Sequence, residues 1–184
     1  MIIVITLPEY IDGEAERIVQ LLCRVDLVHL RKPGSSAERL EQLINEIPTE
    51  YHNRLVLHDH HSLAVKYNLF GVHLNSRNPM PPVGWGGSIS RSCHSLDELM
   101  EWKDRCNYLS LSPIYDSISK QGYMSAFSHE MIRKAAAEGI IDRKVLALGG
   151  VTFNKINDVY KGIEKIISDK DVIIKILAYK TIFI

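Results

Sequence analysis

The sequence has no excess of either charge, because 22 Lys and Arg residues balance 22 Asp and Glu residues. A chain without net charge has no long-range field that attracts nucleic acid or an anionic membrane surface. Any anion binding must then come from a local cluster of cations. We therefore expect no nucleic-acid partner.

Cysteine is scarce, and Cys23, Cys93 and Cys106 show no CxxC spacing. Such usage indicates free thiols in a reducing compartment rather than a disulfide framework. We expect Cys23 to lie in the core, on the apolar face of a helix. No apolar run approaches the ~18 residues of a membrane span, and the first residues lack the basic leader of a signal peptide. We expect a cytoplasmic protein without membrane contact.

A glycine-rich GxGxxG turn is absent after the first β-rich run, which argues against a dinucleotide-binding open sheet. What the chain does contain is an alternation of β-rich runs and helical patterns. The expected strands are Ile2–Thr6, Asp26–Arg31, Arg54–His58, Gly71–Leu74, Trp85–Ser90, Tyr108–Ser112, Lys144–Leu148 and Val172–Leu177. The expected helices are Glu14–Cys23 and, with serines as caps, Ala37–Ile47, Ser95–Lys103 and Ser128–Glu138.

Repeated strand–helix units predict a parallel sheet. Eight strands predict an α/β fold of the (β/α)8 TIM-barrel type, compact because such barrels typically need ~250 residues. An open doubly wound sheet is the alternative. The length of 184 residues suits a single domain over residues 1–184.

Barrel enzymes carry their chemistry at the C-terminal ends of the strands. Arg31 ends the second strand, where a guanidinium can form a fork on phosphate oxygens. Side chains alternate along a strand, so His29 and Arg31 point to one side and Lys32 to the other. The alternative for Arg31 is a solvated salt-bridge residue.

Histidines gather after the third strand, where His58, Asp59, His60 and His61 are consecutive, and His73 lies on the fourth strand. Adjacent side chains diverge, so loop and core histidines are favoured over a zinc site. Asp59 is different, because a carboxylate at a barrel mouth is a natural ligand for Mg²⁺ shared with substrate phosphates.

Two later loops offer phosphate ligands. The loop from Ser112 to Gly122 contains Ser117, Ser119 and Lys120, and a mobile surface loop is its alternative reading. The Gly149–Gly150 turn exposes backbone N–H groups that suit an anion.

Six short motifs in a fixed order give these residues a common interpretation. They are V-H-L-R-K-P at 28–33, L-H-D-H at 57–60, G-V-H-L at 71–74, S-C-H-S at 92–95, S-P-I-Y-D-S-I-S-K at 112–120 and A-L-G-G-V at 147–151. The series resembles the thiamine phosphate synthase family, a set of (β/α)8 enzymes that includes the TenI-type thiazole tautomerases.

The resemblance implies a transferase of thiamine biosynthesis. Hydroxymethylpyrimidine diphosphate loses pyrophosphate, and the nitrogen of a thiazole phosphate captures the pyrimidine cation. By motif match, Arg31, Lys120 and Ser92 hold the diphosphate and Asp59 binds Mg²⁺. Substrate contacts are implied for His29, Lys32, His58 and His73, with Ser117, Ser119, Gly149 and Gly150 on the thiazole phosphate.

The chain departs from the family pattern at several positions. His29 replaces the motif Gln, His58 the motif Asn and Pro33 the motif Lys, and Asn78 stands where the second Mg²⁺-binding Asp is expected. The end of the chain lacks the family's Gly-rich strand, so we expect a divergent eighth strand and a divergent C-terminal tail, which would suit pairing in a homo-oligomer. A tautomerase acting through His29 or His58, and a non-catalytic sensor of thiamine-pathway phosphates, are therefore kept as alternatives.

Overall fold

The computed structural model describes residues 1–114, 127–148 and 175–179 of the chain. Residues 2–90 form one compact unit and residues 91–184, together with Met1, form another.

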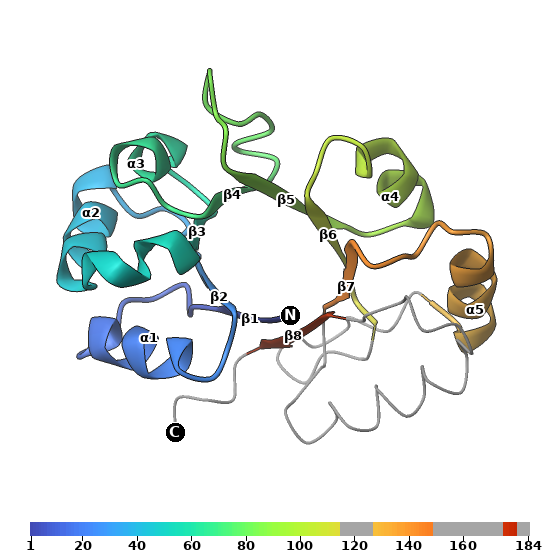
Figure 1. Cartoon of the computed structure of the whole chain (residues 1–184), viewed down its shortest axis with the longest axis horizontal. Coiled ribbons are helices and arrows are strands. Elements are labelled where there is room, and N and C mark those ends of the chain that lie inside the picture. The colour runs from blue at the N-terminus through green and yellow to red at the C-terminus, as the bar shows by residue number, and fades with distance from the viewer. Residues whose placement is uncertain (115–126, 149–174, 180–184) are drawn as a thin grey trace. The chain divides into compact units, whose positions relative to one another are not determined.

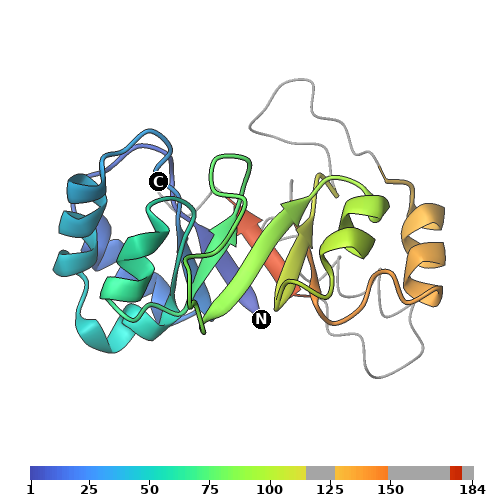
Figure 2. The same cartoon turned by 90° about the horizontal axis from the view of Figure 1, so that it is seen from above.

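Residues 2–90 alternate short parallel strands with helices. The elements are β1 (Ile2–Ile5), α1 (Glu14–Leu22), β2 (Leu27–Leu30), α2 (Ala37–Glu46), the 3₁₀ turn η1 (Thr49–Arg54), β3 (Leu55–Leu57), α3 (His61–Lys66) and β4 (Gly71–Leu74). The strands pair in parallel in the order β1-β2-β3-β4. Helices α1, α2 and α3 follow one another along one side of these strands (Figures 1 and 2). Every position of β2 and β4 is buried, as expected for parallel strands covered on both faces.

The second unit repeats this arrangement. It contains α4 (Leu96–Trp102), β6 (Tyr108–Leu111), α5 (His129–Ala137), β7 (Val145–Ala147) and β8 (Lys175–Tyr179), and β5 (Ser88–Cys93) spans the boundary between the units. Strands β6, β7 and β8 pair in parallel, with Ser110 opposite Leu146 and Leu146 opposite Lys175. A strand therefore exists near the expected Val172–Leu177, but it begins three residues later.

Three predicted helix starts are confirmed by their caps. The hydroxyl groups of Ser36, Ser95 and Ser128 each accept a hydrogen bond from the backbone N–H three residues further on. This contact satisfies an N–H that the first helical turn cannot pair internally.

Other predictions of local structure were wrong. Strand β5 begins at Ser88 rather than Trp85, because Trp85 lies in a turn in which its indole N–H donates to the Ser88 carbonyl at 3.2 Å. Cys23 is exposed rather than in the core, because α1 ends at Leu22 and Cys23 is its C-terminal cap. Neither η1 nor α3 was predicted, since each has only six residues and shows no helical periodicity.

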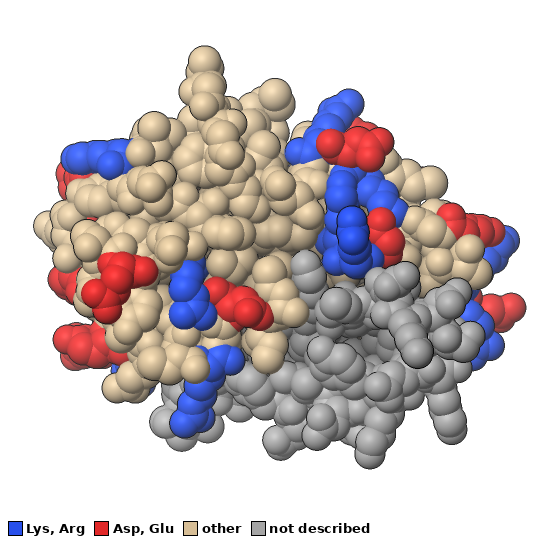
Figure 3. Space-filling model, in the orientation of Figure 1, with Lys and Arg blue, Asp and Glu red and all other residues tan. Residues whose placement is uncertain are grey.

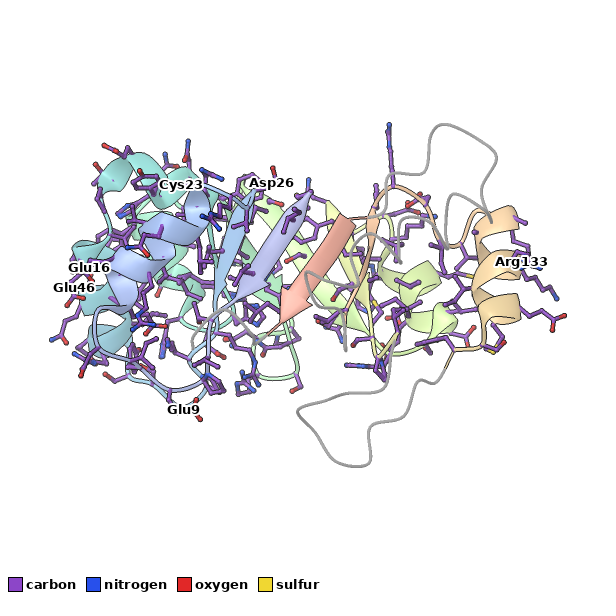
Figure 4. The ribbon with its side chains drawn as sticks, turned by 90° about the horizontal axis from the view of Figure 1, so that it is seen from below. Glu9, Glu16, Cys23, Asp26, Glu46 and Arg133 are labelled. Carbon is purple, nitrogen blue, oxygen red and sulfur yellow. The ribbon has the colours of Figure 1, made fainter. Side chains whose placement is uncertain are left out.

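The two ends of the first unit differ in the loops they carry. Figure 4 shows Glu9, in the loop after β1, at one end and Cys23 and Asp26, in the turn before β2, at the other. The loops after β2, β3 and β4 share the end of Glu9, because the strands are parallel. This is the end where barrel enzymes bind their substrates.

The surface agrees with the balanced composition. On the face drawn in Figure 3, Lys and Arg side chains are interspersed with Asp and Glu side chains among the described residues. None of the helices in the described part of the chain combines the length and apolar character that a membrane span requires.

Candidate active site

Three histidines from neighbouring parallel strands meet inside the first unit. His29 lies on β2, His58 follows β3 and His73 lies on β4, and all three are buried. The His29 Nδ1 and His58 Nε2 atoms are 3.0 Å apart. The rings of His58 and His73 are stacked, with centroids 4.1 Å apart. The sheet register thus unites residues that are up to 44 positions apart in the sequence.

His29 and His58 lie in an environment that opposes protonation. Burial lowers the pKa of His29 well below 6.5, and nearby His73 lowers it further. The pKa of His58 falls for the same two reasons, and His29 and the Arg31 cation add to the effect. Both rings are therefore neutral near pH 7. One of the two nitrogens, Nδ1 of His29 or Nε2 of His58, is protonated and donates to the other.

The tautomer of His73 follows from its neighbour Ser90. The Ser90 hydroxyl donates to the Val72 carbonyl at 3.4 Å, which leaves its oxygen to accept from Nδ1–H of His73 at 2.9 Å. Nδ1 of His73 is therefore the protonated nitrogen in this hydrogen bond.

The three imidazoles also have the ligand types of a transition-metal site, since one nitrogen of each lies within 4.8 Å of the others. The ring geometry opposes that use. A ligated ion lies in the plane of each imidazole at ~2.1 Å from its nitrogen. The planes of His58 and His73 are only 22° from parallel at a centroid separation of 4.1 Å, so they intersect well beyond that distance. The cluster is better described as a packed group of imidazoles than as a metal site.

Of the other histidines, His60 contacts the Ser35 carbonyl at 2.7 Å, and His61 begins α3. The run of four residues from His58 to His61 therefore does not form one site.

Arg31 follows β2 at the end of the sheet that carries the loops. Its backbone N–H donates to the Thr6 hydroxyl at 3.0 Å, which fixes the chain where the strand ends. The side chain is half-buried and near enough to His58 to lower that pKa. Its guanidinium forms no hydrogen bond or ion pair with any residue that the structure describes. A half-buried cation in this state is suited to an anionic ligand.

Lys32 points away from His29, as strand alternation predicts, and its ammonium is fully engaged. It lies 2.6 Å and 2.8 Å from the two carboxylate oxygens of Glu14, and it donates to the carbonyls of Leu7 and Glu9 at 3.0 Å and 2.7 Å. An ammonium has three N–H donors, and these acceptors use all of them. This geometry does not agree with the expected contact between Lys32 and a substrate phosphate, because Lys32 instead ties the loop after β2 to the start of α1.

Asp59, the expected Mg²⁺ ligand, is held by two residues of the loop after β4. Arg77 donates from Nε and a terminal nitrogen to its two oxygens at 3.0 Å and 3.1 Å, and Asn78 donates from Nδ2 at 2.9 Å. The Asp59 side chain is 10% exposed, whereas that of Arg77 is 52% exposed. The carboxylate of this pair is thus buried, while the guanidinium of Arg77 is exposed to solvent.

Asn75 shapes the loop that brings Arg77 and Asn78 to Asp59. Its Oδ1 accepts from the backbone N–H groups of Arg77 and Asn78 at 2.9 Å and 3.0 Å, and its Nδ2 donates to the His58 carbonyl at 2.5 Å. An Asn side chain that accepts from N–H groups two and three positions on stabilises a tight turn. Arg77 was missed as a functional candidate, although Asn75, directly after the strand, is a recognisable turn signal.

These residues do not fit a Mg²⁺ site as they are arranged. Mg²⁺ requires oxygen ligands in near-octahedral geometry. Here both oxygens of Asp59 accept from N–H donors, Asn78 presents its NH₂ group to the same carboxylate, and the Arg77 cation lies where it repels a second cation.

The second unit carries Ser92 on β5 and Ser110 on β6, whose hydroxyls are hydrogen-bonded at 3.0 Å. Cys93 is buried, and burial raises the pKa of its thiol to about 12. His94 contacts the carbonyl and hydroxyl of Ser112, so Cys93 and His94 do not form a nucleophilic pair. Five predicted ligands, Ser117, Ser119, Lys120, Gly149 and Gly150, lie outside the described residues.

Parallel strands alternating with helices, with polar residues after the strands, define an α/β protein of the TIM-barrel type, which confirms the expected fold class. A family model described as "Thiamine monophosphate synthase" matches residues 2–168, and the chain belongs to this family.

Curated relatives agree with this assignment. The chain is 26% identical over 146 residues to a thiamine-phosphate synthase of Photorhabdus laumondii, with 73% of this chain and 66% of the relative covered. It is 28% identical over 145 residues to the thiamine-phosphate synthase of Caldicellulosiruptor saccharolyticus, with 74% of this chain and 65% of the relative covered. The chain thus spans slightly less than two thirds of the length of these relatives.

Solved structures give a closer match in length. A thiamine phosphate pyrophosphorylase from Bacteroides thetaiotaomicron is 34% identical, with a TM-score of 0.81 over 97% of this chain and 82% of that one. A thiamine phosphate pyrophosphorylase from Pyrococcus furiosus, at 17% identity and a TM-score of 0.72 over 97% of this chain and 84% of that one, supports the fold alone.

Proposed function

We propose that this protein is a transferase of thiamine biosynthesis that joins hydroxymethylpyrimidine diphosphate to thiazole phosphate. The bond between the pyrimidine methylene and the diphosphate oxygen breaks, and its electron pair leaves with pyrophosphate. The lone pair of the thiazole nitrogen then forms the new C–N bond. Family membership and the names of the relatives support this proposal.

The observation that carries the proposal is that the half-buried Arg31 guanidinium has no partner among the described residues. A half-buried guanidinium without a partner among the described residues is unfavourable unless a ligand supplies the counter-charge. In the proposed reaction, Arg31 binds the diphosphate and stabilises the charge that develops on it as the C–O bond breaks.

The histidine cluster suits the other product of that bond cleavage. A pyrimidine cation is repelled by a charged imidazolium but not by a neutral imidazole. Burial keeps His29 and His58 neutral, so they contribute lone pairs and dipoles without positive charge. We propose that His29, His58 and His73 contact the pyrimidine side of the substrate.

The remaining assignments are proposals that the family resemblance supports. Ser92 and Lys120 would hold the diphosphate with Arg31, and Ser117, Ser119, Gly149 and Gly150 would bind the thiazole phosphate. The family pattern implies Mg²⁺ with Asp59 and Asn78 as its ligands, but the donor set described above does not fit, so no step here uses the ion. A single domain, a cytoplasmic location, the absence of a nucleic-acid partner and a homo-oligomer stay predictions.

A TenI-type tautomerase and a non-catalytic sensor are not favoured, because the relatives reported above have the name of the synthase.

The decisive experiment measures pyrophosphate release from the two substrates by the wild type, Arg31→Ala and Arg24→Ala. Arg24 is an exposed residue in the turn between α1 and β2, at the opposite end of the sheet, and serves as the matched control. We expect Arg31→Ala to lose at least ~100-fold in turnover, the size of one lost transition-state contact with charge, and Arg24→Ala to remain near the wild type. A wild type that binds both substrates and releases no pyrophosphate would contradict the proposed function.

A further inference from the structure

The loop after β4 places a cation where the family resemblance implies a metal ion. Arg77 forms two parallel hydrogen bonds with Asp59, at 3.0 Å and 3.1 Å, and Asn78 adds a third at 2.9 Å. This fork of two N–H groups on two carboxylate oxygens is the strongest geometry available to an Arg–carboxylate pair.

The arrangement is built rather than accidental. Asp59 is almost fully buried, and Asn75 holds the backbone of Arg77 and Asn78 in a tight turn that is itself tied to the His58 carbonyl. The guanidinium is therefore fixed in orientation on one edge only. Of its five N–H groups, two are donated to Asp59, and no other described residue accepts from the remaining three.

We propose that Arg77, oriented by Asp59, binds the diphosphate group of the substrate in place of a divalent metal ion. This inference rests on the proposed function, since it names the group that neutralises the leaving diphosphate. The free N–H groups of Arg77 donate to diphosphate oxygens, as those of Arg31 do from the end of β2. No proton is transferred, and the electron pair of the broken C–O bond leaves on pyrophosphate.

The charges around Asp59 explain why the Arg77 guanidinium and a divalent metal ion exclude each other. A metal site requires that Asp59 and its neighbours present negative oxygens, and a second carboxylate at position 78 would add to them. This chain has a neutral Asn78 that acts as a donor and a guanidinium that neutralises Asp59. Asn78, which stands where the family pattern has Asp, and Arg77, one residue earlier, thus act together: both favour a guanidinium over a metal ion beside Asp59.

The first test measures binding of inorganic pyrophosphate by calorimetry in excess EDTA, on the full chain. We expect the wild type to bind without metal, and Arg77→Met to bind roughly 10- to 100-fold more weakly, as for the loss of charged hydrogen bonds. Arg77→Lys keeps the charge without the fork and should be intermediate. Arg133→Met, on the exposed face of α5 (Figure 4), is the control and should bind as the wild type does.

The second test asks whether the metal site can be restored, with Mn²⁺ as the probe and electron paramagnetic resonance as the readout. We expect the wild type not to bind Mn²⁺. The double variant Arg77→Ala/Asn78→Asp, which has two carboxylates and no guanidinium, should bind it and should bind pyrophosphate only when the metal is present. Thermal melting checks that each variant is folded, because replacing Arg77 leaves the buried Asp59 carboxylate with Asn78 as its remaining hydrogen-bond partner among the described residues.

The possible results separate this inference from the proposed function. Pyrophosphate binding that needs Mg²⁺ in the wild type, or that is unchanged in Arg77→Met, would overturn the inference while leaving the transferase intact. Metal-free binding that depends on Arg77 would support it even if the complete reaction failed with these two substrates. Turnover of the wild type that persists in EDTA supports both.

Discussion

The ammonium of Lys32 and the carboxylate of Glu14 form a fully buried ion pair, 2.6 Å apart, with side chains 0% and 3% exposed. Burial lowers the pKa of Lys32 from 10.5, and the contact with Glu14 opposes that shift. Removing one member of a buried pair leaves the other charge without compensation, at a cost of about 3–5 kcal/mol. We expect Lys32→Met to lower the free energy of unfolding by about this amount in urea titrations.

An exposed pair in the same unit provides the control. Lys66 and Glu41 are 2.5 Å apart, but the lysine side chain is 62% exposed. Solvent screens an exposed pair, so Lys66→Met should have only a small effect on the free energy of unfolding. The double variant Lys32→Met/Glu14→Leu should be more stable than Lys32→Met alone, because no unpaired charge remains buried. Equal losses for Lys32→Met and Lys66→Met would show that the buried pair has no special role.

The cysteines should differ sharply in reactivity. Burial raises the pKa of Cys93 to about 12 and that of Cys106 to about 11, whereas Cys23 is exposed at the end of α1. Since the thiolate is the nucleophile, iodoacetamide at pH 8 should add one group to the folded chain, at Cys23, and three to the unfolded chain. Mass spectrometry of peptides identifies the sites. Rapid modification of Cys93 in the folded protein would contradict the burial described here.

Much of the fold could be predicted because its signals are local. Apolar and β-branched runs mark the strands. A serine directly before each helix, whose hydroxyl caps the first turn, marks the helix starts at Ala37, Leu96 and His129. The errors are local as well. Gly86 and Gly87 interrupt the run that begins at Trp85, so β5 begins only at Ser88.

The candidate site was less predictable because its contacts are not local. Alternation along β2 correctly separates Lys32 from His29, but nothing near Lys32 identifies Glu14, 18 residues earlier, as its partner. Likewise, Asp59 is evident as a carboxylate after a strand, but its pairing with Arg77 depends on how the loop after β4 folds back. Sequence motifs identified the candidate site residues. Only the packing shows which of them, such as Lys32 and Asp59, already have a partner within the protein.

Asn75 should prove a major contributor to the order of that loop. Its amide connects the His58 carbonyl to the backbone of Arg77 and Asn78. Asn75→Ala leaves these groups without their partner, and we expect a loss of ~1–3 kcal/mol in unfolding free energy. Faster amide hydrogen exchange at Arg77 and Asn78 should accompany it. The exposed Asn53→Ala in η1 is the control and should stay within ~0.5 kcal/mol of the wild type. Unchanged exchange at positions 77 and 78 in Asn75→Ala would refute this role.

The buried histidines should make stability depend on pH in a defined direction. The pKa of His29 lies well below 6.5 in the folded protein, so the unfolded chain binds its proton first as the pH falls. Stability is therefore complete above pH 6.5 and decreases below it, by up to about 1.4 kcal/mol per pH unit for each such histidine.

Replacing His29 by Gln, the residue of the family motif, removes one of these titrating groups and keeps a hydrogen-bonding side chain of similar length. Denaturation curves between pH 5 and 8 should show a shallower decline for His29→Gln than for the wild type, because one proton fewer is linked to unfolding. Asn53→Gln, an exposed substitution that removes no titrating group, is the control and should leave the slope unchanged. A wild type that gains stability as the pH falls below 6.5 would mean that His29 and His58 are charged in the folded protein. The proposed contact between these histidines and the pyrimidine cation would then have to be abandoned.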